Sequence, residues 1–476
     1  SFKMVVSIAT ILHFFSPTTW VFLIITASLT WYFGVRSTTY ALKGILLELN
    51  VRFWRAVLAR CPSLGLGLAR KVKATQPSET VLGVNLVEAK SIGRVSLVDN
   101  DGKGENEDHK VTKRRAVHHA GGNLAEPGEI ITRNDSKATD SCEGAVSTVA
   151  AMATLKAARA AARIHRTVRH EMEPKIKPGM RLDTFVDELE SKVNLHAKFD
   201  PKRPLERGWG FPTGVCLNEV AAHFTPNNPA FSTAPPPQSI IYTANDVLKV
   251  DFGVHVDGHI IDCAFSVTHN PLLVPLLETV KEATYTGIRT AGVDVRVCDV
   301  GAAVSEVMNS RELEDGSPVK VIYNLCGHSI GNYKIHDGQA IPLVDNGDQT
   351  KMKANQLYAV ETFGGAGGGI TGYVTSMGDS SHFMLSPYYD RFSSLLSANG
   401  RRTLTNILKR FSTMPFADRW LSAFDCGNLR ELIRYNVVMD CPPLIDAGPG
   451  GYIAQFEHTI MCGEMGTEII SKGPDY

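Results

Sequence analysis

The segment from Asp251 to Asp262 constrains the fold of this 476-residue chain more than any other. It reads DFGVHVDGHIID, so two runs of β-forming residues flank the dipeptide Asp257-Gly258. This dipeptide is favoured in two-residue hairpin turns, because both turn positions require positive φ angles. The segment therefore predicts a β-hairpin with an acidic residue on each strand.

The predicted turn also determines which side chains share a face of the hairpin. If Val256 pairs with His259, then Asp262 lies opposite Gly253, and Asp251 lies on the same face two positions away. The two carboxylates are then roughly 7 Å apart. Two such charges repel by about 2 kcal/mol at an effective dielectric of about 20. We therefore expect a cation between them, in the gap that Gly253 leaves by having no side chain.

Three later segments each offer one more metal-binding side chain. His328 stands between glycines, where backbone can approach a ligand closely, and Glu361 and Glu457 each lie in an otherwise apolar strand. A buried carboxylate needs a cation or strong hydrogen bonds. Taken singly, each residue is more typical of a core position whose polar groups are hydrogen-bonded. Together with Asp251 and Asp262, the three residues make a set of five that indicates one site. One imidazole and four carboxylates favour two divalent ions (Co, Mn, Fe or Zn), with Mn, Fe or Co preferred over a structural zinc.

Composition places this site in a folded domain of mixed structure. Apolar residues make up 43%, and Lys plus Arg equals Asp plus Glu at 49 each, which excludes global disorder and a strongly basic nucleic-acid binder. Nine cysteines without a CxxC pair favour a reduced, intracellular protein. We expect an α+β domain over 148–476, with helices at 148–174 and 184–193, a helical insert at about 389–438 and a final strand at 452–462.

The first third of the chain differs from this domain. Residues 4–35 contain no Asp, Glu, Lys or Arg, and the basic residues that follow favour a cytosolic location for the rest. We interpret residues 1–75 as a membrane anchor, an organelle presequence or an extension absent from the mature protein. Residues 76–147 predict a disordered linker, since Phe, Tyr and Trp are missing from 55 to 184. The predicted location is the cytoplasm, with the cytosolic face of a membrane or an organelle as alternatives.

The sequence from about residue 150 to 476 resembles type 2 methionine aminopeptidases. The resemblance rests on the motifs at 209–214, 221–226, 251–265, 298–301, 327–331 and 455–459. It implies a pseudo-twofold α+β domain, the pita-bread fold of creatinase-like and aminopeptidase-like enzymes. The insert between Glu361 and Glu457 is typical of type 2 rather than type 1 enzymes.

The resemblance also implies roles for individual residues. The five dimetal ligands match Asp251, Asp262, His328, Glu361 and Glu457, with Asp262 and Glu457 bridging both ions. The histidines that flank the metal site match His223 and His336, and the methionine-pocket wall matches Phe211, Ile335, His336 and His382. We expect Glu361 to take the proton of the attacking water, His336 to donate to the substrate carbonyl, and His223 to orient the substrate amide.

The implied function is removal of the initiator methionine from nascent polypeptide N-termini, preferentially before a small second residue. Metal-activated hydroxide would attack the first peptide bond. We expect a monomer that works beside the ribosome, with residues 4–35 as a possible membrane attachment. Two departures from the family pattern, Pro415 after Met414 and Cys441 before two prolines, put the pocket shape in question.

Two other functions remain open from the sequence. Proline-specific peptidases of the same fold share the order of the five ligands, although the flanking motifs and the insert differ. Proliferation-associated relatives keep the fold, lose ligands and bind RNA and ribosomes instead. All five ligand types are intact in this chain, which favours an enzyme over a binding module.

Overall fold

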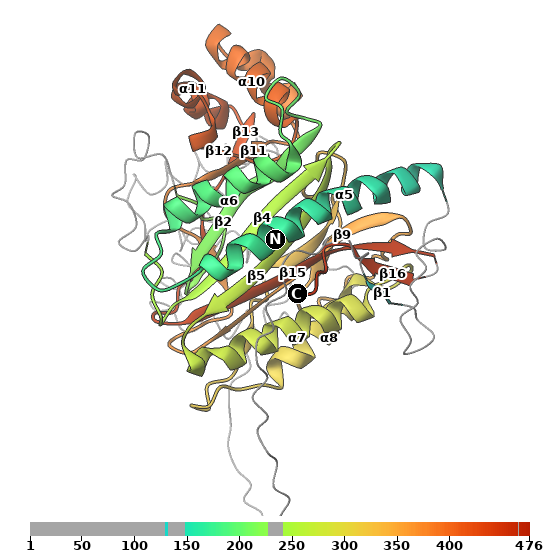
Figure 1. Ribbon diagram of the computed structural model, residues 1–476, viewed down its shortest axis with the longest axis vertical. Helices are drawn as coiled ribbons and strands as arrows, with labels where there is room; N and C mark the ends of the chain where they lie inside the picture. Colours follow the sequence, from blue (N-terminus) through green and yellow to red (C-terminus); the bar gives the residue numbers. More distant parts are fainter. Residues whose placement is uncertain (1–128, 132–147, 227–240, 465) are drawn as a thin grey trace, which may run out of the picture. The chain divides into compact units, whose positions relative to one another are not determined.

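The computed structural model describes residues 129–131, 148–226, 241–464 and 466–476 (Figure 1), all within a compact unit that spans Arg115–Tyr476. The predicted anchor or presequence at residues 1–75, and most of the predicted linker, lie outside the described residues. No helix in the described ranges is long and apolar enough to cross a membrane.

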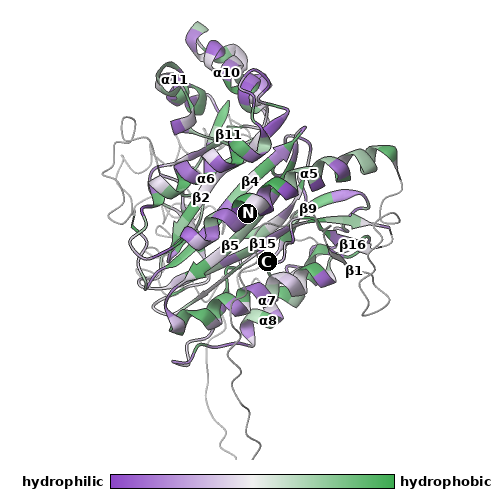
Figure 2. Ribbon diagram, in the orientation of Figure 1, coloured by the Kyte–Doolittle hydropathy of each residue, from purple (hydrophilic) through white to green (hydrophobic). Residues whose placement is uncertain are grey.

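The first half of the domain is a helical pair packed on a three-stranded sheet. Helix α5 (Val149–Met172) begins after Thr148, whose Oγ1 accepts a hydrogen bond of 3.1 Å from the backbone N–H of Ala151. This helix confirms the one predicted at 148–174. Helix α6 (Leu182–Ala197) extends beyond the predicted 184–193 at both ends. Figure 2 shows hydrophilic and hydrophobic residues mixed along both helices, as one buried and one solvated face require.

The sheet beneath these helices has the antiparallel order β2-β4-β5. Its strands are β2 (Arg207–Leu217), β4 (Val247–Val256) and β5 (His259–Thr268). Strand β4 is buried along almost its whole length because helices cover one face and the second half of the domain covers the other. Figure 1 shows α5 and α6 crossing the near side of these strands.

The second half repeats this plan with a larger sheet. Its two main helices, preceded by the 3-10 turn η3 (Pro271–Leu273), are α7 (Val274–Thr290) and α8 (Val297–Asn309). The seven-stranded sheet has the order β1-β16-β15-β9-β7-β8, with β6 on β9. Its strands are β1 (Glu129–Ile131), β6 (Lys320–Val321), β7 (Cys326–Ile330), β8 (Ala340–Pro342), β9 (Gln356–Ala366), β15 (Tyr452–Gly463) and β16 (Gly466–Ile469). The α+β fold class is confirmed.

The helical insert predicted at 389–438 is present and has a hydrophobic cluster of its own. It comprises α9 (Tyr389–Phe392), η4 (Ser393–Leu395), α10 (Ala398–Phe411), β12 (Phe416–Ala417), η5 (Asp418–Trp420) and α11 (Ala423–Arg434). Strand β12 joins the small sheet β12-β11-β13, formed with β11 (His382–Leu385) and β13 (Val438–Cys441). A second small sheet, β10-β14-β3, contains β10 (Val374–Ser376), β14 (Leu444–Asp446) and β3 (Val220–Ala222). The short turn η2 (Glu173–Lys175) follows α5.

Two predicted boundaries differ from the structure at the same edge of the large sheet. The strand predicted to be final ends at Gly463, but a further strand, β16, begins at Gly466. Strand β1 lies inside the predicted linker and pairs with β16 from Glu129↔Ile469 to Ile131↔Thr467. A three-residue strand is too short to show a periodic pattern in the sequence. Strand β1 forms because β16 offers it an edge with backbone groups to pair with.

The two halves meet where β5 crosses β15, and side chains join them there. Thr459 Oγ1 accepts a hydrogen bond of 2.8 Å from the N–H of Asp262 and donates one of 2.7 Å to its carbonyl oxygen. Ser266 Oγ makes the same pair of bonds to the backbone of Gln455, both at 2.8 Å. We call this contact the β5–β15 seam. It satisfies backbone groups that would otherwise be buried without partners.

A buried ion pair also ties the halves together. Arg169 on α5 is 1% exposed and donates to both carboxylate oxygens of Asp475, at 2.7 and 2.8 Å. The same guanidinium donates to the carbonyl oxygen of Tyr476 at 3.0 Å. Bidentate pairs of this kind hold two segments in a defined orientation.

We predict that Arg169→Met lowers the free energy of unfolding by about 3–5 kcal/mol, because it leaves the Asp475 carboxylate without its partner in a mostly buried position. Lys175→Met is the control, since its partner Glu188 is 44% exposed and such pairs contribute about 0–1 kcal/mol. Denaturant unfolding of both variants measures the difference. Equal losses would show that the Arg169 pair does not hold the halves together.

Candidate metal centre

The hairpin predicted from Asp257-Gly258 is present with the predicted register. Val256 pairs with His259 and Gly253 with Asp262. The two turn residues have φ angles of 52° and 79°, in the left-handed region that this turn requires. Asp251 and Asp262 consequently face the same side of the hairpin.

The remaining three predicted ligands come from the second half of the domain. His328 lies on β7, Glu361 on β9 and Glu457 on β15. Glu361 and Glu457 are direct cross-strand partners, and His328 pairs with Ala359, two residues from Glu361. Two acidic side chains directly opposite each other repel, so this register is unfavourable unless something positive lies between them.

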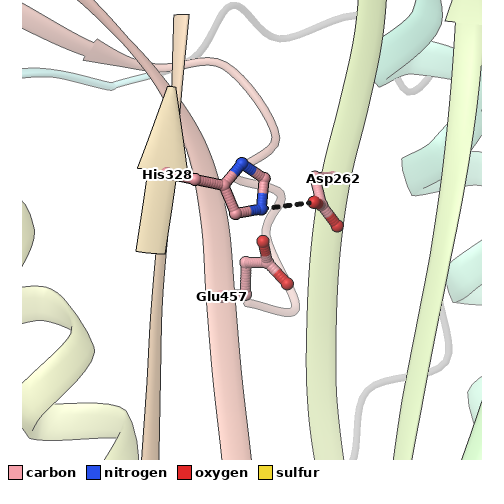
Figure 3. Close-up of side chains that lie close together, drawn as sticks. All are labelled: Asp262, His328 and Glu457. Atoms are coloured by element: carbon pink, nitrogen blue, oxygen red, sulfur yellow. Dashed lines mark ion pairs between the residues drawn. The ribbon is translucent and has the colours of Figure 1, made fainter. Parts of the chain in front are cut away.

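The ligand atoms of the five residues converge from both halves. His328 Nε2 is 3.5 Å from Asp262 Oδ2 and 3.5 Å from Glu361 Oε1. Ligand atoms of Asp262, His328 and Glu457 all lie within 4.8 Å of one another, and Figure 3 shows these three side chains pointing towards a common centre. The geometry therefore brings together groups that are far apart in the sequence.

Gln455 completes the cluster and was not among the predicted site residues. Its amide nitrogen donates to Asp251 Oδ2 at 3.3 Å and to Glu361 Oε2 at 3.4 Å. One neutral amide therefore links the carboxylates of both halves. Its place in the sequence, two residues before Glu457 on the same strand, puts the two side chains on one face and was the signal that could have identified it.

The electrostatics of the cluster fit divalent cations. Within the described part of the chain, Asp251 Oδ1, Asp262 Oδ1 and both carboxylate oxygens of Glu457 are buried without a hydrogen-bond partner. Burial raises the pKa of Asp262 to about 7. Burial, and then the neighbouring carboxylates, raise the pKa values of Asp251, Glu361 and Glu457 well above their ordinary range. Unpartnered oxygens of this kind, with one imidazole, are the donor set that Mn, Fe, Co and Zn ions take.

The imidazole of the cluster is already in the form that binds metal. Burial lowers the pKa of His328 to about 4, so the ring is neutral at physiological pH and one nitrogen has a free lone pair. His336 packs edge-on against it, with ring centroids 4.3 Å apart. Solvent reaches His336, yet desolvation and then His328 lower its pKa to about 3.

The predicted substrate residues line a pocket that opens onto the cluster. The pocket contains every predicted pocket residue and four of the five predicted ligands, namely Phe211, His223, Ile335, His336, His382, Asp251, Asp262, His328 and Glu361. The sequence analysis missed several further lining residues, among them Cys216, Lys249 and Met384. Pro415 and Cys441, the two departures from the family pattern, also line it. Missed residues of this kind carry no pattern of their own, because adjacent strands of the fold determine which side chains reach the pocket.

Gly253 does not have the role that the sequence suggested. A Cβ atom built at this position would lie 2.3 Å from two ring carbons of Phe211. The space next to Gly253 therefore accommodates the phenyl ring of Phe211, its cross-strand partner, and leaves no gap for an ion there. The prediction was wrong because a hairpin viewed alone omits the third strand.

His223 has a strained backbone. Its φ angle is 66°, a left-handed conformation that costs a non-glycine residue about 1–3 kcal/mol and persists only where the surroundings enforce it. Burial, and then His336, lower the pKa of its imidazole to about 4. The ring is 6.0 Å from that of His382. Strain of this kind, in a pocket that acidic side chains also line, is typical of active sites.

Comparison with known proteins agrees with this geometry. The profile of metallopeptidase family M24 matches residues 156–385. The chain is 43% identical over 325 residues to methionine aminopeptidase 2 of Clavispora lusitaniae, a match that covers 67% of this chain and 71% of that protein. The protein of the same name in Saccharomyces cerevisiae is 43% identical over 332 residues and is covered to 75%. This chain belongs to the methionine aminopeptidase 2 family.

A solved structure of a thermophilic Arx1 shares the fold of this metallopeptidase, with a TM-score of 0.56 at 16% identity over 70% of this chain and 93% of that one. The fold and family predicted from the sequence motifs are therefore confirmed.

We predict that metal affinity rises with pH. Asp262 with a pKa of about 7 binds a proton below that pH, and the other raised carboxyl pKa values act in the same direction, whereas His328 competes only near pH 4. For each proton that the metal ion must displace, metal affinity falls roughly tenfold per pH unit below the pKa of the group that holds the proton. Calorimetric titration of the metal-free enzyme with Mn²⁺ at pH 6, 7 and 8 checks this. The same affinity at all three values would contradict it.

Proposed function

We propose that this enzyme removes the initiator methionine from nascent polypeptides, preferentially where the second residue is small. The observation that carries the proposal is that four of the five predicted ligands line the same pocket as Phe211 and Ile335. Membership of the methionine aminopeptidase 2 family supports it.

The proposed metal centre holds two divalent ions through Asp251, Asp262, His328, Glu361 and Glu457. When bound, such ions activate a water molecule and polarise the scissile carbonyl group. The donor set favours a class of ions, namely Mn, Fe, Co or Zn. Cellular supply decides among them, because these ions have similar affinities for such a site.

Three side chains of the pocket have proposed catalytic roles. Glu361 takes the proton of the attacking water and passes it to the leaving amine. His336, neutral because of its lowered pKa, donates a hydrogen bond to the substrate carbonyl oxygen as charge develops there. His223, also neutral, orients the scissile amide.

The pocket wall selects the side chain of the substrate. Phe211 and Ile335 are both buried and both line the pocket, so an aromatic ring and an aliphatic chain face the cavity. A methionine side chain is unbranched and polarisable, and its sulfur makes favourable contacts with aromatic rings. His382 completes the wall, and Pro415 and Cys441 add smaller groups to it.

The proposal extends to the cellular setting. An enzyme that acts on nascent chains works in the cytoplasm beside the ribosome, and we propose that it does so as a monomer. The cysteines that the structure describes are all free, in agreement with a reducing compartment. Sedimentation of the full chain with ribosomes, and its distribution between membrane and soluble fractions at high salt, test the location and the proposed attachment through residues 4–35.

We predict that Asp251→Asn or His328→Ala abolishes cleavage of the peptide Met-Ala-Ser, because either change removes a proposed metal ligand. Product methionine, measured at saturating Mn²⁺, is the readout, and circular dichroism shows that each variant remains folded. Retained turnover by a metal-free preparation would reject the mechanism.

Two measurements separate this function from its alternatives. Elemental analysis of the purified protein should give about two bound ions per chain, whereas a binding module of the same fold gives none. Cleavage of Met-Ala-Ser but not of an Xaa-Pro dipeptide excludes a proline-specific peptidase. Cleavage of Xaa-Pro alone would replace the proposal.

We predict that Gly253→Ala raises KM for Met-Ala-Ser roughly 10- to 100-fold, because the added methyl group displaces the Phe211 ring from the pocket wall. Gly427→Ala is the matched control, since nothing lies within 4 Å of a Cβ atom at that position. Steady-state kinetics give KM and kcat separately. An unchanged KM in the Gly253 variant would show that Phe211 does not form the methionine site.

A further inference from the structure

Ser381 is a fully buried residue with no role assigned so far. It precedes strand β11, its side chain is 0% exposed, and it does not line the pocket itself. Its neighbour in the chain is His382, which does. A buried hydroxyl group costs free energy unless it is hydrogen-bonded, so its partners indicate what it does.

The hydroxyl group of Ser381 contacts three groups around the pocket. Its Oγ accepts a hydrogen bond of 3.1 Å from the backbone N–H of Thr225 and donates one of 3.3 Å to the carbonyl oxygen of His223. The same atom is 3.1 Å from Nδ1 of His382. A hydroxyl can donate one hydrogen bond and accept two, so these contacts use its full capacity when Nδ1 carries a proton.

Two of these contacts hold a strained segment. His223 has a φ angle of 66° and follows directly on the last residue of β3, so the chain turns sharply out of the sheet there. Ser381 holds the carbonyl group of His223 on one side of Phe224 and the N–H group of Thr225 on the other. The serine is 158 residues away from His223 in the sequence, so this support comes from another part of the fold.

The third contact of Ser381, with His382, involves a different sheet. His223 follows β3 of the sheet β10-β14-β3, whereas His382 begins β11 of the sheet β12-β11-β13 and pairs there with Ala417 and Cys441. Ser381 is thus a hydrogen-bonded link between the two small sheets that carry the two pocket histidines. A change in its position would move both imidazoles relative to each other.

We propose that Ser381 is a positioning residue that fixes His223 and His382 in the orientation the substrate requires. This inference rests on the proposed function. Ser381 does not touch the substrate, and it acts through two side chains with different tasks. His382 forms the methionine wall, so its displacement raises KM, and His223 orients the scissile amide, so its displacement lowers kcat.

The test uses the full chain loaded with Mn²⁺ and the peptide Met-Ala-Ser. Ser381→Ala should raise KM and lower kcat, with a combined loss in kcat/KM of roughly 10- to 100-fold, because small misplacements of catalytic groups have effects of this size. Ser381→Cys replaces the hydroxyl group by a somewhat larger thiol that forms weaker hydrogen bonds. This variant should lose activity in the same two constants if the Ser381→Ala variant fails to fold well. Ser386→Ala is the matched control, since Ser386 is also buried and accepts a hydrogen bond from the N–H of Tyr388, outside the pocket.

A purely structural role for Ser381 gives a different result. Partial unfolding reduces the fraction of active enzyme, which lowers the apparent kcat in proportion and leaves KM unchanged. An unchanged KM in both Ser381 variants, or a loss of equal size in Ser386→Ala, would overturn the proposal. Wild-type enzyme that fails to cleave Met-Ala-Ser would refute the proposed function instead.

A double-mutant cycle checks that Ser381 acts through His382. In a His382→Ala background the imidazole is already absent, so Ser381→Ala should cost much less in KM than it costs in the wild-type chain. The cost through His223 remains and appears in kcat. Additive effects on KM in the double variant would show that the two residues are independent and would count against the inference.

Discussion

The constraint on which the structure depends is the meeting of four largely buried carboxylates. Glu361 and Glu457 are direct partners on neighbouring strands, and Asp251 and Asp262 approach them from the other half of the domain. In the described part of the chain, several of their oxygens are buried without hydrogen bonds. Like charges in a medium of low dielectric repel strongly. Such an arrangement is stable only when protons or cations neutralise the carboxylates. The raised pKa values of the four side chains reflect their burial and mutual repulsion.

The rest of the domain serves to bring these groups together. Each half has two helices on one side of a sheet, and the sheets meet at the β5–β15 seam, where Thr459 and Ser266 bond to backbone groups on the opposite strand. Thr459 holds the backbone of Asp262 itself. The seam therefore places Asp262, a proposed ligand from the first half, against the strand of the second half that carries Glu457, and hydroxyl groups replace the backbone ladder that would join two strands of one sheet.

The sequence predicted those features that depend on neighbouring residues. The hairpin register followed from Asp257-Gly258, because a two-residue turn leaves one pairing, and helix α5 followed from its 3.6-residue spacing, whereas α7 and α8 were not predicted. Features that depend on distant residues were missed or misread. Phe211 rather than an ion lies beside Gly253, β1 pairs with β16, and Gln455 joins the two acidic pairs, since each contact is set by strands that come together only in the folded chain. The motifs predicted the candidate ligands, whereas the contacts around them depend on the folded chain.

The insert has its own hydrophobic cluster, separate from the main core, yet the segments that it supports bring Pro415 and Cys441 to the pocket. That cluster contains no residue of β4, β5, β9 or β15, the strands that carry the acidic residues. Evolution can therefore reshape one side of the substrate cavity while the reactive centre stays the same. A small molecule that contacts Pro415 and Cys441 would discriminate between this protein and relatives with bulkier groups at those positions. It would do so even where the metal-binding residues of the two proteins are identical.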